Sequence, residues 1–306
     1  MMKRNRMIVW LMACVLSMPF AMVSCSSDDD EPKTPSENNV AGLPLLTETE
    51  DGLYTDGKMK FEIKDADGRT LSLKTLVEYD TYTSLDIPAY VNIKGKRYSV
   101  VEIGLTAFLG PDGNNGLKKD TKLESITLPN TLQTIQHGAF VGCTALKSIF
   151  IPKNVSYIGE EIPFCFCDAL KKIEVDKANP NYDSRNNSNC IIQTKKGVVL
   201  VGCMNSVIPT DPDVTSIAPA AFIACTGLEK ITIPANITKI GKRAFFYCNN
   251  LKELSCLSPT PPTLEDTDVF YFIHESCVLY VPKGCKETYA NAENWPFKYD
   301  DIVAIY

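Results

Sequence analysis

The chain has 306 residues, of which 44% are apolar and 22% charged, so it can bury a large core and is not a broadly disordered polypeptide. Its formal net charge of −6 argues against nucleic acid as a partner and against electrostatic adhesion to anionic lipid.

Residues 1–24 are predicted to be a signal peptide. Three positive side chains, Lys3, Arg4 and Arg6, precede an apolar stretch at 7–20. A basic segment followed by a short apolar one is typical of export signals. An uncleaved membrane anchor is the alternative, although the apolar stretch is too short to span a bilayer comfortably.

A cysteine follows this stretch at the end of the motif Met22-Val23-Ser24-Cys25. The motif resembles the lipobox of bacterial lipoproteins, with Met22 where leucine is commonest and Ser24 where alanine or glycine is commonest. We therefore expect cleavage before Cys25 and lipidation of Cys25, with an ordinary signal peptide as the alternative. Cleavage removes three positive charges and takes the net charge from −6 to −9, and the acyl chains supply a stable membrane anchor.

Residues 25–42 are predicted to be a lipidated flexible tether. Segment 26–39, SSDDDEPKTPSENN, is polar, acidic and proline-containing, so it has nothing to bury in a core. An acidic cluster directly after a lipidated cysteine also resembles the surface-export signal of some Gram-negative anaerobes. A plain solvated linker is the alternative interpretation.

Residues 43–99 are predicted to form an N-terminal β cap. Two apolar segments, 59–63 and 70–73, flank the turn sequence DADG at 65–68. Such a turn between two short apolar runs favours a β-hairpin.

Most of the remaining chain consists of copies of one 23-residue unit. Segments 123–145 (LESITLPNTLQTIQHGAFVGCTA) and 228–250 (LEKITIPANITKIGKRAFFYCNN) agree in residue class at nine spaced positions. Self-similarity at a fixed period in the twenties is the signature of a leucine-rich-repeat coil.

The unit has a consistent physical interpretation. Its first residues form a short strand that ends at a proline, Pro234 in the later copy, because proline cannot donate to a strand ladder. A second apolar pair, Ile237 and Ile240, lines the other wall of the coil, and Ala244 and Phe245 fill its interior. One copy cannot fold alone, whereas stacked copies share strand hydrogen bonds and a continuous core.

We therefore predict a mainly β repeat solenoid over 100–254, a right-handed leucine-rich-repeat coil whose short strands are joined by turns or short helices. Copies begin at Leu123, Leu146, Leu170 and Leu228. Residues 255–306 are predicted to form a C-terminal cap, because an open solenoid end would expose core.

The copy from Leu170 is 58 residues long instead of 23. Its extra residues, near 176–209, include two apolar strands at 190–193 and 198–203 joined by the turn TKKG. This pattern predicts a hairpin insertion that protrudes from the solenoid.

The unit LPxxLxxIxxxAFxxCxxL resembles the BspA-like leucine-rich-repeat surface proteins of Gram-negative anaerobes. The insertion after the motif NPNY at 179–182 and the ending VPKG at 281–284, followed by Trp295, are similar to the same family, so the resemblance covers about 82–306. The resemblance implies an exported binding or adhesion protein, with host-protein contact among the family's roles. It does not carry over a ligand.

Four cysteines each precede the next repeat's leucine by three residues and are predicted to stack as a structural ladder of reduced, buried thiols that cap loop carbonyls: Cys143, Cys167, Cys225 and Cys248. Successive coils lie about 4.8 Å apart, so distance does not exclude disulfides. An exported location favours disulfides, and the pairs Cys190–Cys203 and Cys256–Cys277 are further alternatives.

No cofactor, metal site or catalytic site is predicted. The Cys-Phe-Cys motif at 165–167 lacks the two-residue gap of zinc knuckles. The sequence has two histidines, His137 and His274, and neither paired carboxylates nor a phosphate-binding glycine loop can be placed. A hydrolase with Cys143 as nucleophile and His137 as base is the enzymatic alternative; we expect no enzyme.

The predicted ligand face consists of the residues that flank the second apolar position of each repeat strand and therefore point outward: Ser125, Thr127, Ser148, Phe150, Lys172, Glu174, Lys230, Thr232, Glu253 and Ser255. Phe150 is the one aromatic residue among them and the best single anchor candidate. A generic solvated sheet face is the alternative. Loop 110–120 and the hairpin at 190–203 are rival sites, since both depart from the regular array.

The sequence thus predicts an exported lipoprotein of the outer membrane, displayed at the cell surface, that binds a protein or glycan ligand. Host surface or matrix proteins are among the candidate ligands. Contact with the membrane is through the lipid anchor alone, and nucleic acid is not a partner. The alternative from another class is a structural scaffold subunit of an outer-membrane complex.

Overall fold

The computed structural model describes residues 39–111, 117–118, 122–160 and 162–305, which belong to one compact unit. The predicted signal peptide, the lipidation site Cys25 and the tether up to residue 38 lie outside the described residues. The same is true of most of the 110–120 loop; its ends pair as β8 (Gly110–Pro111) and β9 (Leu117–Lys118).

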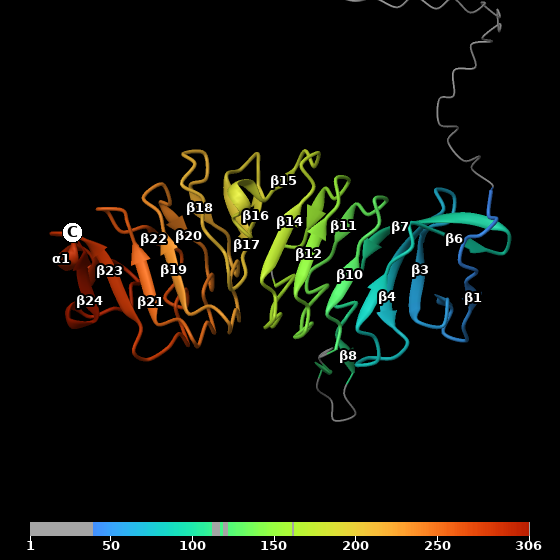
Figure 1. Ribbon diagram of the computed structural model, residues 1–306, viewed down its shortest axis with the longest axis horizontal. Helices are drawn as coiled ribbons and strands as arrows, with labels where there is room; N and C mark the ends of the chain where they lie inside the picture. Colours follow the sequence, from blue (N-terminus) through green and yellow to red (C-terminus); the bar gives the residue numbers. More distant parts are fainter. Residues whose placement is uncertain (1–38, 112–116, 119–121, 161, 306) are drawn as a thin grey trace, which may run out of the picture. The chain divides into compact units, whose positions relative to one another are not determined.

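Successive repeats each add one strand to a first layer, which we call the strand wall (Figure 1). Its strands are β5 (Ser84–Asp86), β10 (Ser125–Thr127), β12 (Ser148–Ile151), β14 (Lys172–Val175), β19 (Lys230–Ile233), β21 (Glu253–Cys256), β23 (Val278–Pro282) and β24 (Ile302–Ile305). All pairings within the wall are parallel: β5–β10, β12–β14 and β19–β21–β23–β24. Side chains alternate between buried and exposed along β12, β14 and β19, as period-2 apolar patterning requires.

The second apolar pair of each repeat forms a second layer, the return wall. Its strands are β4 (Thr70–Leu76), β7 (Lys96–Ile103), β11 (Thr134–Ile135) and β13 (Tyr157–Ile158), followed by β17 (Val198–Val201), β18 (Ser216–Ile217), β20 (Lys239–Ile240) and β22 (Thr263–Leu264). Each of these two groups pairs in parallel. Equivalent apolar residues lie side by side, as Ile217 does with Ile240 and Ile240 with Leu264.

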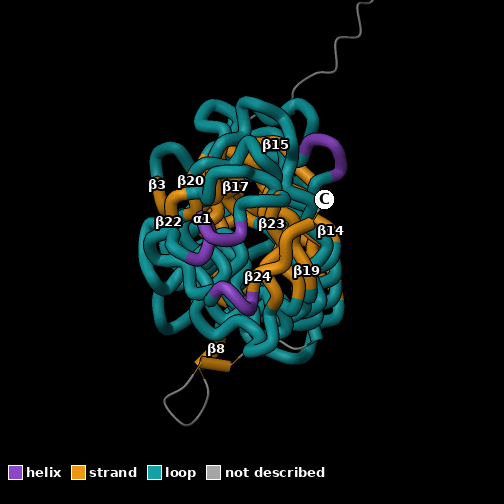
Figure 2. The backbone as a smooth tube through the Cα atoms, turned by 90° about the vertical axis from the view of Figure 1, so that its left-hand side faces the viewer, coloured by secondary structure: helices purple, strands orange, loops and turns teal. Residues whose placement is uncertain are grey.

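Antiparallel strands are added at the N-terminal end. The hairpin predicted around 65–68 is present as β3 (Met59–Asp65) and β4. β1 (Thr47–Glu48) and β2 (Tyr54–Thr55) extend it, and β6 (Tyr90–Ile93) pairs with β7. Helix is scarce in the described part of the chain: two 3-10 turns, η1 (Arg185–Asn187) and η2 (Tyr299–Asp301), and one five-residue α-helix, α1 (Lys286–Ala290). Seen from the end that carries α1, the two layers of strands are surrounded by loops (Figure 2).

Phenylalanines of successive repeats stack on one another in two groups. Ring centroids are 5.1 Å apart for Phe108–Phe140 and 5.0 Å for Phe140–Phe164. A second stack has Phe222–Phe245 at 4.9 Å and Phe245–Phe270 at 5.3 Å. These distances lie in the range at which aromatic pairs add to the stability gained from burial, so the stacked rings tie neighbouring repeats together.

The inserted hairpin does not protrude, contrary to the prediction. β16 (Ile191–Gln193) pairs antiparallel with β15 (Tyr182–Asp183) and with β17, but β17 also pairs in parallel with β18. The insertion therefore supplies a further strand to the return wall. Consecutive residues of both hairpin strands are apolar and buried, among them Ile191, Ile192, Val199 and Leu200, so neither face of the hairpin can be left in water.

Gly202 takes the place of the phenylalanine in this insertion. Its amide donates to Ala221 O at 2.8 Å, just as the amide of Phe222 donates to Ala244 O at 2.8 Å. A Cβ on Gly202 would lie 2.0 Å from an edge carbon of the Phe222 ring, so a larger residue does not fit without displacing that ring. The phenylalanine stack is therefore built in two segments, one ending at Phe164 and one starting at Phe222.

The C-terminal residues cover the last phenylalanine. Trp295 lies 5.5 Å and Phe297 6.0 Å from Phe270 between ring centroids. Trp295 Nε1 donates to Pro262 O at 3.1 Å, and Tyr289 Oη donates to Ser258 O at 2.8 Å. The polar ends of both buried rings are thus satisfied, as buried Trp and Tyr require.

We expect Phe245→Ala to lower the free energy of unfolding by about 3–5 kcal/mol, because its ring is fully buried and stacks on both sides. Urea unfolding followed by circular dichroism measures the loss. Phe150→Ala, the same chemical change at a side chain that is 48% exposed, is the matched control and should cost far less. Equal losses for the two variants would contradict the repeat register.

Candidate functional site

The structure places the ten predicted face residues on the outer side of the strand wall, with nine of them exposed and Ser255 partly buried. Register puts Ser148 beside Lys172 and Phe150 beside Glu174, and it puts Lys230 beside Glu253 and Thr232 beside Ser255. β14 and β19 belong to different sheets. β10 pairs with β5 and not with β12, so the ten residues form three separate groups rather than one hydrogen-bonded face.

Phe150 is the exposed apolar side chain of this face. Its neighbours on β14, Lys172 and Glu174, pair with each other at 2.9 Å, and the nearby Lys147–Glu124 pair spans 2.5 Å. Both ion pairs are exposed and contribute little to stability. Phe150 is thus an exposed apolar side chain whose charged neighbours are paired with each other. Such surroundings fit a residue that contacts a ligand and equally a residue on a solvated sheet face.

The four ladder cysteines lie at equivalent turns. Cys167 Sγ donates to Phe140 O at 3.2 Å, and Cys248 Sγ donates to Phe222 O at 3.1 Å. Each of these thiols thus caps a carbonyl of the preceding phenylalanine-bearing turn. The alternative pair Cys190 and Cys203 is also present as two thiols, which donate to Ser188 O and Asn189 O at 3.5 Å each.

Burial keeps these thiols protonated. Burial raises the pKa of Cys167 and of Cys225 well above the ordinary value, and raises the pKa of Cys248 to about 12. A thiolate, which is the nucleophilic and metal-binding form, is therefore disfavoured at each position. Within the described ranges, no group of three or more His, Cys, Asp or Glu side chains is arranged to hold a metal ion.

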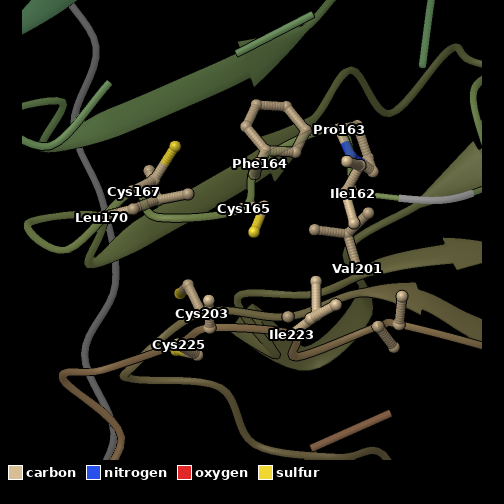
Figure 3. A pocket seen from close by; sticks show the side chains of 14 residues that line it. Ile162, Pro163, Phe164, Cys165, Cys167, Leu170, Val201, Cys203, Ile223 and Cys225 are labelled. Atoms are coloured by element: carbon tan, nitrogen blue, oxygen red, sulfur yellow. The ribbon is translucent and has the colours of Figure 1, made fainter. Parts of the chain in front are cut away.

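A small internal cavity of about 20 Å³ lies where the phenylalanine stack is interrupted. Cys165, Cys167 and Phe164 lie on one side of it, and Cys203 and Cys225 on the other (Figure 3). This volume holds about one water molecule. Gly202 is one of its lining residues, and the cavity is too small for an organic ligand.

An exposed aromatic cluster that the sequence analysis did not single out lies along the turns that follow the stacked phenylalanines. We call it the aromatic edge; it consists of Phe166, Phe246, Tyr247, Tyr271 and Phe272. Ring centroids are 4.4 Å apart for Tyr271–Phe272, 5.6 Å for Phe246–Phe272, 6.0 Å for Tyr247–Phe272 and 6.1 Å for Phe166–Tyr247. Tyr247 is 40% exposed and Tyr271 and Phe272 are each 55% exposed, so the edge is a contiguous apolar surface facing solvent.

Three of these aromatic residues have left-handed backbone conformations. From Phe140 onward, the second residue after each stacked phenylalanine has a positive φ: 79° at Gly142, 57° at Phe166, 50° at Ala224, 62° at Tyr247 and 59° at Phe272. Glycine adopts this region without strain, whereas a bulky side chain does not. Glycine and alanine serve the same turn in other repeats, so the fold sets the left-handed conformation and does not require an aromatic residue there.

A signal for the aromatic edge is present in the sequence. Two successive repeats carry three aromatic residues in a row, Phe245-Phe246-Tyr247 and Phe270-Tyr271-Phe272, although the coil interior has room for only the first. The second and third aromatic residues must then lie outside. An earlier repeat has Val141-Gly142 at these positions, so the two additional aromatic residues are a departure from the repeat pattern that the sequence itself shows.

A cleft of about 220 Å³ adjoins the aromatic edge at its C-terminal end. Tyr271, Phe272, Phe270 and Phe297 form its apolar side, and His274, Glu275 and Asp301 supply its polar groups. A second cleft, of about 230 Å³, lies over the return wall, where the ion pairs Glu160–Lys196 and Lys239–Glu265 flank an apolar floor that includes Leu200 and Ile217.

The stacked strands, the repeated phenylalanine and the proline-ended strand define a leucine-rich-repeat protein. The family described as "BspA type Leucine rich repeat region (6 copies)" matches residues 113–195 and 202–292, and the chain belongs to this family. A search of curated proteins found no match. No helix in the described part of the chain has the length and apolar character needed to cross a membrane.

Among solved structures, the chain is similar to a leucine rich cell surface protein from Faecalibacterium prausnitzii A2-165, with 19% identity, a TM-score of 0.39, and coverage of 75% of this chain and 88% of that one. It is similar to the T. pallidum leucine rich repeat protein, with 19% identity, a TM-score of 0.38, and coverage of 79% and 94%. A leucine-rich repeat protein from Bacteroides capillosus has 26% identity and a TM-score of 0.30, over 40% of this chain and 98% of that one.

Replacement of Tyr247 by glycine and by alanine tests the backbone strain. Both changes remove the ring, but only glycine relieves the left-handed conformation, so we expect Tyr247→Gly to be more stable than Tyr247→Ala by about 1 kcal/mol. At strand position Phe150 the order should reverse, because glycine in an ordinary strand costs about 0.5–1 kcal/mol relative to alanine. Urea unfolding of the four variants checks both signs; the same order at both positions would contradict the strain.

The buried thiols predict a loss of stability at alkaline pH. Burial raises the pKa of Cys248 to about 12 from an ordinary 9.0, and the same holds for Cys190. Above pH 9 the unfolded chain loses thiol protons that the folded chain keeps, so the free energy of unfolding should fall between pH 9 and 12, by up to about 1.4 kcal/mol per pH unit for each thiol. In urea titrations from pH 8 to 11, Cys248→Ala should show a shallower fall than the unsubstituted protein. Parallel slopes would contradict the prediction.

Proposed function

We propose that the chain is an exported binding protein that uses the aromatic edge as its principal contact surface for a macromolecular ligand, protein or glycan. The observation that carries the proposal is the contiguous exposure of Tyr247, Tyr271 and Phe272 together with the left-handed backbone of Tyr247 and Phe272. Exposed aromatic side chains supply most of the binding energy at many interfaces, and patches of this kind on soluble proteins mark interaction sites.

The strand wall is proposed as a second contact surface. Its ten face residues stand in rows that β12–β14 and β19–β21 hold in register, and repeat proteins use such rows for recognition. Phe150 is its anchor. The two surfaces share no residue, so each can be disabled by substitution without changing the other.

The architecture supports this role. The repeats are proposed to form a right-handed solenoid over 100–254, with the β-rich segment 43–99 and the segment 255–306 as its caps. The cover of Phe270 by Trp295 and Phe297 supports the second assignment. Such a rigid array presents fixed surfaces to a partner with little loss of conformational freedom on binding.

Attachment to the outer membrane through a lipid on Cys25, with display at the cell surface, is proposed from the N-terminal sequence. Residues 1–24 then act as a signal peptide, and 25–42 as the tether that carries the folded part away from the bilayer. The family match supports a repeat protein, and the anchor is a separate proposal. Protease treatment of intact cells should release the folded part, whereas full protection would contradict surface display.

We expect Tyr247→Gly combined with Phe272→Gly to keep the folded state and to lower ligand capture at least tenfold. Pull-down from solubilised cell-surface and host matrix fractions, with the unsubstituted protein as reference, measures this. Phe150→Ala is the matched aromatic deletion on the strand wall. Loss of ligand capture by Phe150→Ala alone would show that the binding site is on the strand wall and not on the aromatic edge. Capture of only a co-expressed membrane protein would favour a scaffold role.

A further inference from the structure

We propose that the cleft at the C-terminal end of the aromatic edge accepts a lysine or arginine side chain from a basic segment of a partner protein. This inference rests on the proposed function and names the ligand chemistry of that surface.

The size of the cleft suits one side chain. Its volume of about 220 Å³ is below the roughly 300–1,000 Å³ typical of small-molecule pockets. Phe270 and Phe297 are almost fully buried and form the base, while the 55% exposed Tyr271 and Phe272 stand at the mouth. A long side chain with an apolar stem and a charged end can bury its stem on these rings and keep its charge near the rim.

The charges of the cleft favour a cation. Glu275 and Asp301 line it, and its lining includes no lysine or arginine. Across residues 39–305, apart from the few positions the structure does not describe, neither carboxylate takes part in an ion pair; Asp301 accepts the neutral backbone amide of Lys298 at 3.1 Å. His274 Nδ1 accepts the backbone amide of Ser276 at 3.1 Å.

The same surface already holds a cation from this chain. The Arg243 guanidinium lies 5.8 Å from the centroid of the Phe246 ring, within the aromatic edge, and its Nε donates to Asp268 Oδ2 at 2.8 Å. Lys286 Nζ lies 4.2 Å from the centroid of Tyr299. At Arg243 an aromatic face and a carboxylate together hold a cation, and the cleft offers both groups with no lysine or arginine in its lining.

The other cavities do not fit this chemistry. The internal cavity of about 20 Å³ is closed by thiols and apolar side chains. The cleft over the return wall has its carboxylates, Glu160 and Glu265, already paired with Lys196 and Lys239, so it has no net charge to offer.

The test uses a fluorescein-labelled hexapeptide of alternating glycine and arginine, and the same peptide with citrulline in place of arginine. Citrulline keeps the shape of arginine and removes its charge. Fluorescence anisotropy with the purified full chain should show binding of the arginine peptide at least tenfold tighter than of the citrulline peptide. Added salt should weaken it, because the rim charges are partly exposed.

Glu275→Gln combined with Asp301→Asn should weaken arginine-peptide binding at least tenfold, and Phe272→Ala should weaken it to a similar degree. The charge-matched control is Asp67→Asn combined with Asp86→Asn, two exposed carboxylates at the N-terminal end, which should change binding less than twofold. Phe150→Ala is the aromatic control on the strand wall and should leave peptide binding unchanged.

Equal binding of the two peptides, undiminished binding to the Glu275/Asp301 double variant, or absence of arginine-peptide binding would overturn the inference. None of these results contradicts the proposed function, which is tested separately by measuring capture of the native ligand by the glycine variants of Tyr247 and Phe272. If those variants lose a neutral glycan ligand while the arginine peptide does not bind, the aromatic edge is a binding surface and the cation assignment is wrong.

Discussion

Stacking of one phenylalanine per repeat is the interaction on which the rest of the structure depends. Phe140 and Phe245 each meet a neighbouring ring on both sides at centroid distances of 4.9 to 5.3 Å, so the turns that carry the rings must keep this spacing. The turn around each ring needs left-handed residues, such as Arg243 two residues before Phe245 and Tyr247 two residues after it. Core packing thereby determines the shape of the outer edge, where the binding surface is proposed.

At the interruption of the phenylalanine stack, between Phe164 and Phe222, the inserted hairpin takes the place of a regular repeat. Gly202 fills the phenylalanine position of the insertion, and the hairpin that carries it joins the return wall through β17 and β18. No strand pairing crosses this point in either wall, because β14 and β19 lie in different sheets and so do β13 and β17. Continuity between the two halves of the repeat array therefore depends more on the loops and on the insertion than on a continuous sheet.

The repeat period was enough to predict the strands, the buried phenylalanines and the membership of the family, because each depends on residues that recur at fixed spacing. The position of the hairpin was not predictable from residue spacing, because two apolar strands fit both a protruding hairpin and strands of the return wall. The burial of both hairpin faces explains why it joins the return wall. The aromatic edge was missed because Phe246 and Tyr247 adjoin Phe245 in the sequence, and only the turn geometry separates the buried ring from the exposed ones. The predicted ligand face does lie on the outer side of the strand wall. The separation of β14 from β19 follows from the insertion and was not predictable from the sequence.

Hydrogen–deuterium exchange of the protein, free and bound to the ligand that it captures, is the most direct measurement of where contact occurs. The account predicts that backbone amides of the aromatic-edge turns, residues 242–248 and 268–275, exchange more slowly in the complex, while those of β12 and β14 do not change. Protection confined to β12 and β14, with the turns unaffected, would contradict it.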